Sequence, residues 1–588
     1  MTVTAALKVL QAARKREGVS YPIELVCGFT PLHLETFLAA HLQQRMEDKA
    51  VSVSTGLFGN AAGTLESLAE KDVRAVALAL EWQDLDPRLG FRSTGQWGPA
   101  LLPDILQNVR GTLGRMAAAI ERLASGVNVA CSLPTLPMPP LFHNPGWQLA
   151  DAELALERAL LEFVARCAAR RGFAAVSRQR LAEESPAAAR HDFKSELLSG
   201  LPYTVPHADC VAESLARLLA PPAPKKGLIT DLDDTLWHGL VGEVGPENVT
   251  WDLASHQHLH GLYQKLLAAL SEEGVLVAIA SKNDPEIARQ ALARPDMLLA
   301  PERVFPVEVH WNAKSGSVER ILRTWNIGAD SVVFVDDSPM ELAEVAAAHP
   351  GIECLLFPKN DAAAGYALLR RLRDLLGKPR LAEEDTIRLE SIRQGAAFQD
   401  AAQDGASADE FLRQAEASIA LDCDPSSSDP RTLELVNKTN QFNLNGRRYT
   451  ESEWSGRLRR QGAFLMAASY RDKFGPLGKI AVVEGRLEDG TLYIETWVMS
   501  CRAFARRIEH QCLRTLFERS GAGKAVFDFS ATPKNGPLRD FLGSVTGRPL
   551  EGPVGCTRSR FEEACPALYH QVEETQSSKE SWTQSQPA

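Results

Sequence analysis

The chain lacks the features that mark secreted, membrane-spanning and nucleic-acid-binding proteins. Its ten cysteines are scattered over 588 residues without a C-x-x-C pair, so we expect reduced thiols in a cytoplasmic protein. The longest apolar runs are far shorter than a membrane span, and residues 1–18 show helical spacing without the apolar core of a signal peptide. Positive charge is not in excess either: 64 Lys and Arg face 75 Asp and Glu, a net charge of −11. This balance argues against nucleic acid and anionic membranes as partners.

Alternating strand and helix patterns predict a multidomain α/β protein. Residues 1–219 contain five short apolar segments separated by helical patterns, an alternation that favours a parallel sheet. The proline-rich segment "LAPPAPKKG" indicates a linker, after which residues 227–360 repeat the alternation as a second domain. The other predicted parts are a helical connector at 361–416, an α+β domain with a hairpin at 417–572, and a disordered tail at 573–588.

Polar residues gather at the ends of three predicted strands of the middle domain. Asp231 and Asp233 follow the first strand, Ser281 ends the second, and Asp336 and Asp337 end the third. In open parallel sheets ligands bind at the carboxyl ends of the strands. Because close carboxylates repel one another unless a cation lies among them, and because hard oxygen ligands suit Mg²⁺, the sequence predicts a magnesium site there.

These residue types suit phosphoryl transfer. One carboxylate can attack phosphorus, while a second carboxylic acid two residues further on protonates the leaving oxygen. Lys314, just before a helical stretch, and Ser281 would neutralise the charge of the transferred group. The alternative is that the acids are helix caps and solvated loop ends, the commoner setting for any single Asp.

The middle domain resembles the haloacid dehalogenase (HAD) superfamily. The first motif of that superfamily, DxDx[TV], is matched by Asp231, Asp233 and Thr235; Ser281 and Lys314 match the second and third motifs, and the acidic pair in "FVDDSP" matches the fourth. The resemblance implies that Asp231 is the nucleophile and Asp233 the acid and base.

The resemblance also implies the ligands of Mg²⁺. They are Asp231, the backbone carbonyl of Asp233 and one residue of the acidic pair, Asp336 or Asp337, with Asp337 favoured.

Longer segments are similar to the FkbH-like family, HAD subfamily IIIC. They are "DLDDTLWHGLVGEVG", "ASKND", "VHWNAKS", "NKTNQFNLNGRRY" and "MSCRAFARRIE". The resemblance implies a Rossmann-like HAD domain with a minimal cap, between an SGNH-hydrolase-like domain without its nucleophilic serine and a GNAT-like (acetyltransferase-like) domain. Where the family often reads "DNTLWGG", this chain has Asp234 and His238.

Family members remove phosphate from 1,3-bisphosphoglycerate and load the glyceryl group onto an acyl carrier protein in polyketide biosynthesis. The expected partners are therefore a small phosphorylated acid and an acyl carrier protein. A plain phosphatase without acyl transfer and a noncatalytic scaffold of the same fold are the alternatives.

One stretch of the last domain offers a candidate acyl thiol. Cys501 precedes three arginines, a setting that lowers a thiol pKa, and Arg502 and Arg506 are candidate contacts for a pantetheine phosphate. Both glycines of the acetyl-CoA loop pattern R-x-x-G-x-G are missing here, which argues against acetyl-CoA transfer. A buried core cysteine and a solvated basic helix face are the alternatives.

Overall fold

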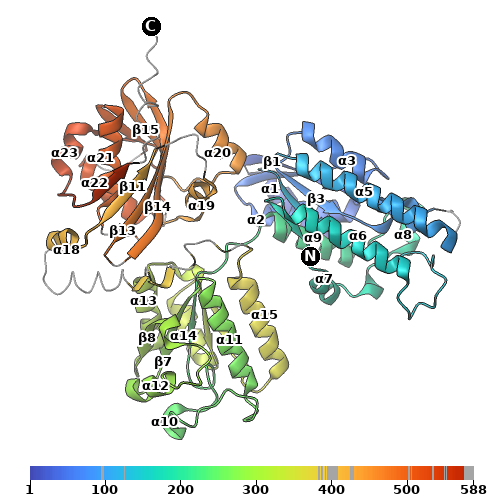
Figure 1. Cartoon of the computed structure of the whole chain (residues 1–588), viewed down its shortest axis with the longest axis horizontal. Helices are drawn as coiled ribbons and strands as arrows, with labels where there is room; N and C mark the ends of the chain where they lie inside the picture. Colours follow the sequence, from blue (N-terminus) through green and yellow to red (C-terminus); the bar gives the residue numbers. More distant parts are fainter. Residues whose placement is uncertain are drawn as a thin grey trace. The chain divides into compact units, whose positions relative to one another are not determined.

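The computed structural model describes most of the chain, and its contacts divide it into two compact units, Met1–Ala223 and Pro224–Ala588. The described residues are 1–16, 18–93, 98–124, 126–379, 381, 385, 388–390, 392–393, 408–423, 429–473, 475–500, 503–504, 506–532, 535–547, 550 and 552–574. The predicted α/β multidomain architecture with parallel sheets is confirmed (Figure 1). No described helix combines the length and the apolar content needed to cross a membrane.

The first unit is a parallel sheet with helices on both faces. Its five strands lie in the order β2-β1-β3-β4-β5, and each neighbouring pair is parallel. Helices α2 and α9 bury their apolar sides on one face, and α3, α5 and α6 bury theirs on the other. The strands are β1 (Val19–Val26), β2 (Lys49–Thr55), β3 (Ala75–Ala79), β4 (Asn128–Ser132) and β5 (Phe173–Ala175). The helices are α1 (Val3–Ala13), α2 (Leu32–Arg45), α3 (Ala61–Ser67), α4 (Trp82–Leu85), α5 (Leu102–Arg122), α6 (Asp151–Ala168), α7 (Arg178–Glu184), α8 (Phe193–Ser199) and α9 (Val205–Leu219).

The second unit begins with another parallel sheet, of order β10-β9-β6-β7-β8. The three central strands β6, β7 and β9 are buried because helices cover both faces of the sheet. Helices α11, α12 and α15 lie on one side, and α13 and α14 lie on the other. The strands are β6 (Gly227–Thr230), β7 (Leu276–Ser281), β8 (Val304–Val309), β9 (Val332–Asp336) and β10 (Glu353–Leu356). The helices are α10 (Val241–Val244), α11 (His258–Glu272), α12 (Pro285–Leu292), α13 (Lys314–Trp325), α14 (Pro339–Ala348) and α15 (Ala362–Leu376).

Strand β8 is an addition to the three strands that the sequence predicted up to Asp337. Its segment contains Pro306, which has no N–H for a central sheet position. β8 lies at the edge of the sheet, next to β7 only, where a proline is tolerated.

The remaining sheet of the second unit is mostly antiparallel. Its order is β17-β16-β15-β14-β13-β11-β18, with β12 paired to β15, and the predicted hairpin is the β14–β15 pair. The strands are β11 (Ser418–Asp422), β12 (Phe442–Asn443), β13 (Ala463–Asp472), β14 (Gly475–Glu488), β15 (Thr491–Met499), β16 (Lys524–Phe527), β17 (Val554–Thr557) and β18 (Gln571–Glu574). The helices are α18 (Ala408–Gln414), α19 (Pro430–Lys438), α20 (Glu451–Leu458), α21 (Ile508–Ser520), α22 (Gly536–Thr546) and α23 (Arg558–Ala564).

β18 runs two residues beyond the limit of 572 predicted for this domain, because Glu573 and Glu574 pair with β11. The rest of the predicted tail, 575–588, lies outside the described residues.

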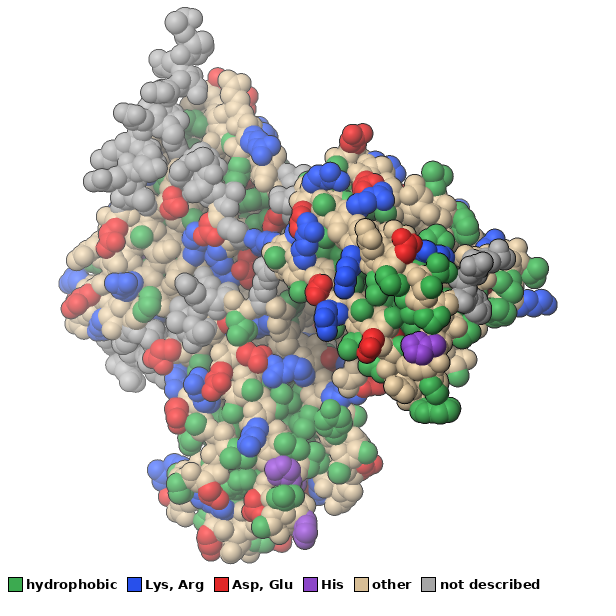
Figure 2. All heavy atoms as spheres, turned by 45° about the vertical axis from the view of Figure 1, so that its right-hand side comes forward, with side chains coloured by type: hydrophobic (Ala, Val, Ile, Leu, Met, Phe, Trp, Pro, Cys, Tyr) green, Lys and Arg blue, Asp and Glu red, His purple; other side chains and the backbone are tan. Residues whose placement is uncertain are grey.

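Charged side chains are mixed over the surface. On the face drawn in Figure 2, acidic and basic side chains alternate over the described part without a large area of one sign. This face therefore offers no basic stripe of the kind that nucleic-acid binding uses.

Candidate active site

The predicted site residues of the middle domain meet at one edge of its sheet. β6 lies between β7 and β9, and all three run parallel, so their carboxyl ends are neighbours. Asp231 directly follows β6, Ser281 ends β7 and Asp336 ends β9. Lys314 is the first residue of α13, which begins close to this edge.

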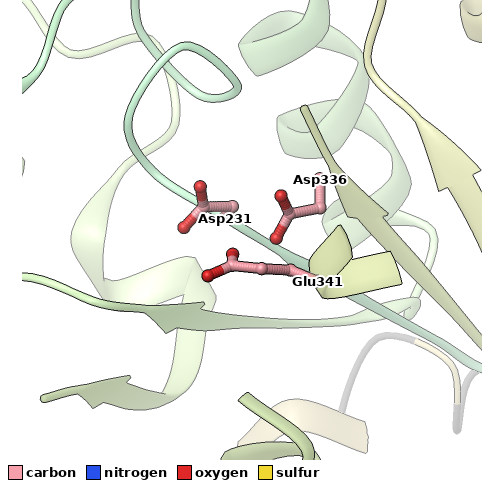
Figure 3. Close-up of side chains that lie close together, drawn as sticks. All are labelled: Asp231, Asp336 and Glu341. Atoms are coloured by element: carbon pink, nitrogen blue, oxygen red, sulfur yellow. The ribbon is translucent and has the colours of Figure 1, made fainter. Parts of the chain in front are cut away.

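Lys314 is the centre of a buried ion cluster. Its Nζ atom lies 2.9 Å from Asp231 Oδ1 and 2.6 Å from Asp336 Oδ2, and it also contacts Glu341. The three carboxylates point toward one another in Figure 3, with one oxygen of each within 4.8 Å of the others. Lys314 is 2% exposed and Asp336 is completely buried, so water does not screen these contacts.

Burial and the mutual charges of the cluster together determine the pKa values of its members. Desolvation raises the pKa of Asp231 above its usual range even though Lys314 favours the ionised carboxylate. The pKa of Asp336 is raised too, first by burial and then by the charge of Asp231. For Lys314 burial acts in the opposite sense, but the charges of Asp231 and Asp336 outweigh it and raise the pKa of the ammonium group. The three carboxylates together can therefore carry more negative charge than the single Lys314 ammonium group neutralises.

Asp233, in the loop after β6, accepts hydrogen bonds from three donors. Its Oδ1 atom accepts hydrogen bonds from Trp237 Nε1 (2.8 Å) and from the Val241 backbone N–H (3.1 Å), and its Oδ2 atom accepts one from Asn283 Nδ2 (3.0 Å). The same Asn283 amide lies 3.3 Å from Ser281 Oγ. These contacts fix the Asp233 carboxylate beside the predicted phosphate-binding hydroxyl.

Asp337 turns away from Lys314. Its Oδ2 atom accepts a hydrogen bond from Lys359 Nζ at 2.9 Å, and Asp337 does not belong to the close cluster of Asp231, Asp336 and Glu341. The two residues of the acidic pair thus have different lysine partners.

Sequence reasoning missed two polar residues of the site. Glu341 contacts Lys314 and lies 3.0 Å from Lys282 Nζ, although its position in "SPME" is that of an ordinary acid in the first turn of α14. Asn283 follows Ser281 in "ASKND" and bonds Asp233. The signal that could have found Asn283 is its place two residues beyond a strand end that already carried a predicted site residue.

The candidate residues of the last domain are not part of this cluster. Cys501 and Arg502 lie outside the described residues. Arg506 is 2% exposed, and its Nε atom lies 3.3 Å from Asp472 Oδ2 in a buried ion pair. The burial of this guanidinium group against Asp472 fits neither a solvated basic helix face nor an exposed contact for a pantetheine phosphate.

The donor set suits a hard divalent cation. Carboxylate oxygens from Asp231, Asp336 and Glu341 converge on Lys314 Nζ, so the ammonium group occupies the point between them. Asp231 and Asp337 follow the neighbouring strands β6 and β9, and their remaining carboxylate oxygens are hard donors of the kind that Mg²⁺ prefers. Burial raises the pKa values of Asp231 and Asp336, and the charge of Asp231 raises that of Asp336 further, so keeping both carboxylates ionised costs free energy. A cation at this edge would relieve that cost.

Comparison with known proteins shows the fold. No protein-family model and no curated protein matches the chain. A solved structure, the N-terminal part of the protein BF1531 from Bacteroides fragilis containing a phosphatase domain complexed with Mg, is 17% identical with a TM-score of 0.50, and the match covers 64% of this chain and 99% of that chain. An uncharacterized protein from Corynebacterium glutamicum is 17% identical over 26% of this chain and 98% of its own, with a TM-score of 0.19, too low to support an argument. The fold and site define a multidomain α/β protein with a Rossmann-like parallel sheet and a cluster of acids at its carboxyl edge.

Proposed function

We propose that the middle domain is a Mg²⁺-dependent, HAD-type enzyme that transfers or hydrolyses the phosphoryl group of a small phosphorylated acid. The observation that carries this proposal is the buried Lys314, which joins Asp231 and Asp336 at the carboxyl edge of a parallel sheet. The Bacteroides fragilis protein of the same fold contains a phosphatase domain complexed with Mg, which supports the proposal.

Asp231 is the nucleophile. Its carboxylate attacks phosphorus, the bond to the leaving oxygen breaks, and an aspartyl phosphate forms on the enzyme. Lys314, 2.9 Å from Asp231 Oδ1, favours the ionised carboxylate against the effect of burial and provides a positive charge that also stabilises the transferred group. Ser281, at the end of the neighbouring strand, contributes a hydroxyl to the phosphoryl oxygens.

Asp233 handles protons. As a carboxylic acid it protonates the leaving oxygen, and as a carboxylate it then takes a proton from the group that attacks the aspartyl phosphate. The bonds from Trp237 and Asn283 hold it in place for both steps.

Asp231, the backbone carbonyl of Asp233 and Asp337 would hold the Mg²⁺ ion; Asp337 is favoured over Asp336 because Asp336 is already bonded to Lys314. Bound there, Mg²⁺ supplies Lewis-acid stabilisation of the charge on the phosphoryl oxygens.

The finer proposal is that the phosphorylated acid is an acyl phosphate such as 1,3-bisphosphoglycerate, and that the acyl group is loaded onto an acyl carrier protein. It rests on the FkbH-like resemblance. The segment 231–257 between β6 and α11, which the structure describes throughout, supports it: α10 is the single helix in this segment and has one turn, and a small cap leaves the site accessible to a large partner.

The test combines phosphate release with the intact mass of a pantetheinylated acyl carrier protein. The full-length enzyme is incubated with Mg²⁺ and 1,3-bisphosphoglycerate, and both signals are followed in one reaction. We expect phosphate release and a glyceryl-sized mass gain, and we expect Asp231→Asn to abolish both.

Asp361→Asn is the matched control. Asp361 is an exposed N-cap of α15, and asparagine caps a helix equally well, so this variant should retain full activity. Phosphate release without carrier modification would support phosphatase activity and would reject the loading of an acyl group onto that carrier protein. If Asp231→Asn were as active as the wild type, Asp231 would not be the nucleophile and the proposed active site would be rejected.

A further inference from the structure

Lys359 connects the loops that follow three strands of the middle sheet. It lies beyond β10, and its Nζ atom is 2.8 Å from Asp234 Oδ2 in the loop after β6 and 2.9 Å from Asp337 Oδ2 after β9. The side chain is 37% exposed, whereas those of Asp234 and Asp337 are 17% and 19% exposed. The contact is therefore partly shielded from water.

Asp234 is held independently of Lys359. Its backbone is in the left-handed region (φ 51°), and its Oδ1 atom accepts a hydrogen bond from the Gly239 N–H at 2.9 Å. One carboxylate oxygen thus belongs to the local turn and the other to Lys359. Burial alone would raise the pKa of Asp234, but the hydrogen bond and charge of Lys359 keep it below its usual range. The pKa of Lys359 is raised by its bonds to Asp234 and Asp337.

We propose that Lys359 is a positioning residue for Asp337 as a Mg²⁺ ligand, and that Asp234 balances the charge of Lys359 so that the bound cation is not repelled. This inference rests on the proposed function, which makes Asp337 a ligand. By bonding one oxygen of Asp337, Lys359 fixes the rotation of that carboxylate and leaves the other oxygen for the metal. Hydrogen-bonding partners behind metal ligands commonly change metal affinity by 10–100-fold.

The charges explain why two residues are needed. A lone ammonium group beside Asp337 would repel a divalent cation at short range. With Asp234 as its second partner, the Lys359 ammonium group is neutralised while it still donates to Asp337. The pair therefore orients the ligand without adding net charge to the site.

The decisive variant removes both partners together, Asp234→Asn with Lys359→Gln. The net charge of the protein stays the same. If the pair acted only through its charge, the affinity for Mg²⁺ would therefore not change. Asparagine also accepts the Gly239 hydrogen bond and tolerates left-handed backbone, which preserves the turn. Isothermal titration calorimetry of the full-length protein with MgCl2 should show a Kd for Mg²⁺ raised about 10–100-fold.

The matched control is Glu319→Gln with Arg323→Gln, an exposed ion pair on α13 of the same domain (2.9 Å). It should leave the Kd for Mg²⁺ unchanged. Lys359→Arg, which keeps the donor and the charge, should retain most of the affinity. Thermal unfolding of every variant in EDTA checks that the fold is intact. A variant that has unfolded can then be distinguished from one in which Asp337 is no longer positioned.

A double variant that binds Mg²⁺ as tightly as the wild type, or more tightly, overturns this inference and leaves the proposed function standing. If the wild-type protein itself does not bind Mg²⁺, the proposed function fails and this inference fails with it. If the double variant binds Mg²⁺ weakly while the wild type releases no phosphate from any phosphate ester or acyl phosphate, only the proposed reaction is rejected.

Discussion

Replacing Lys314 by methionine removes the single ammonium group shared by three carboxylates. Removing one partner of a buried ion pair costs about 3–5 kcal/mol, because the remaining charge is left uncompensated. Lys314 is 2% exposed and contacts Asp231 and Asp336 at 2.9 and 2.6 Å, so we expect a loss in this range. Typical domains are stable by about 5–15 kcal/mol, and the variant would lose a large share of that.

The size of the loss depends on pH. Without Lys314 the pKa values of Asp231 and Asp336, already raised in the folded protein, rise further. Between the unfolded-state pKa of about 4 and these higher values, the folded state binds more protons than the unfolded state. The free energy of unfolding of Lys314→Met therefore falls as pH rises, and the variant should be closest to the wild type at about pH 5 and furthest from it at about pH 8.

Hydrogen exchange measured by mass spectrometry on peptides of β6 and β9 reports this local stability without assuming two-state unfolding of the whole chain. Lys282→Met is the matched control, since Lys282 is 32% exposed and contacts Glu341 at 3.0 Å. Partly exposed pairs contribute about 0–1 kcal/mol. Millimolar MgCl2 should restore part of the stability of Lys314→Met. Protection equal to the wild type at pH 8, or a loss that does not depend on pH, would refute the reasoning.

Three further substitutions test the packing of the middle domain, the hairpin turn of the last sheet and the support of Asp233. Gly227→Ala places a Cβ atom 2.4 Å from Trp325 Cζ3, and thermal unfolding should show a loss of about 1–3 kcal/mol from overpacking. Gly490→Ala, at φ +69 in the hairpin turn but in open space, should cost only about 1 kcal/mol in the same assay. Trp237→Phe removes the N–H that donates to Asp233 at 2.8 Å; kcat for phosphate release should fall about tenfold with little change in KM, because a proton-transfer group is less well held.

Most of the fold was accessible from periodicity alone. The five apolar segments of the first unit are its five strands. The central strands β3 and β4 appear as short continuous apolar runs because they are buried on both faces. β8 was not predicted because Pro306 and the charged Glu308 interrupt its apolar pattern. This sequence can form a strand because β8 lies at the edge of the sheet.

The site was predictable as far as backbone direction determines it. Asp231, Ser281 and Asp336 could be placed together because the ends of neighbouring parallel strands meet. Glu341 could not, because an acid in the first turn of a helix is explained equally well by the helix dipole. Whether such a side chain stays in solvent or contacts a lysine of another helix depends on tertiary packing.

The acidic pair shows where sequence reasoning stops. Successive residues at the end of a strand point to opposite sides, so Asp336 and Asp337 could not both face Lys314. Alternation therefore predicts that the pair divides between two partners, and the structure shows Asp336 with Lys314 and Asp337 with Lys359. The identity of the second partner is not local information, since Lys359 also bonds Asp234, 125 residues earlier in the chain. A lysine in the loop after an edge strand becomes part of the site only because β10, β9 and β6 are consecutive in the sheet.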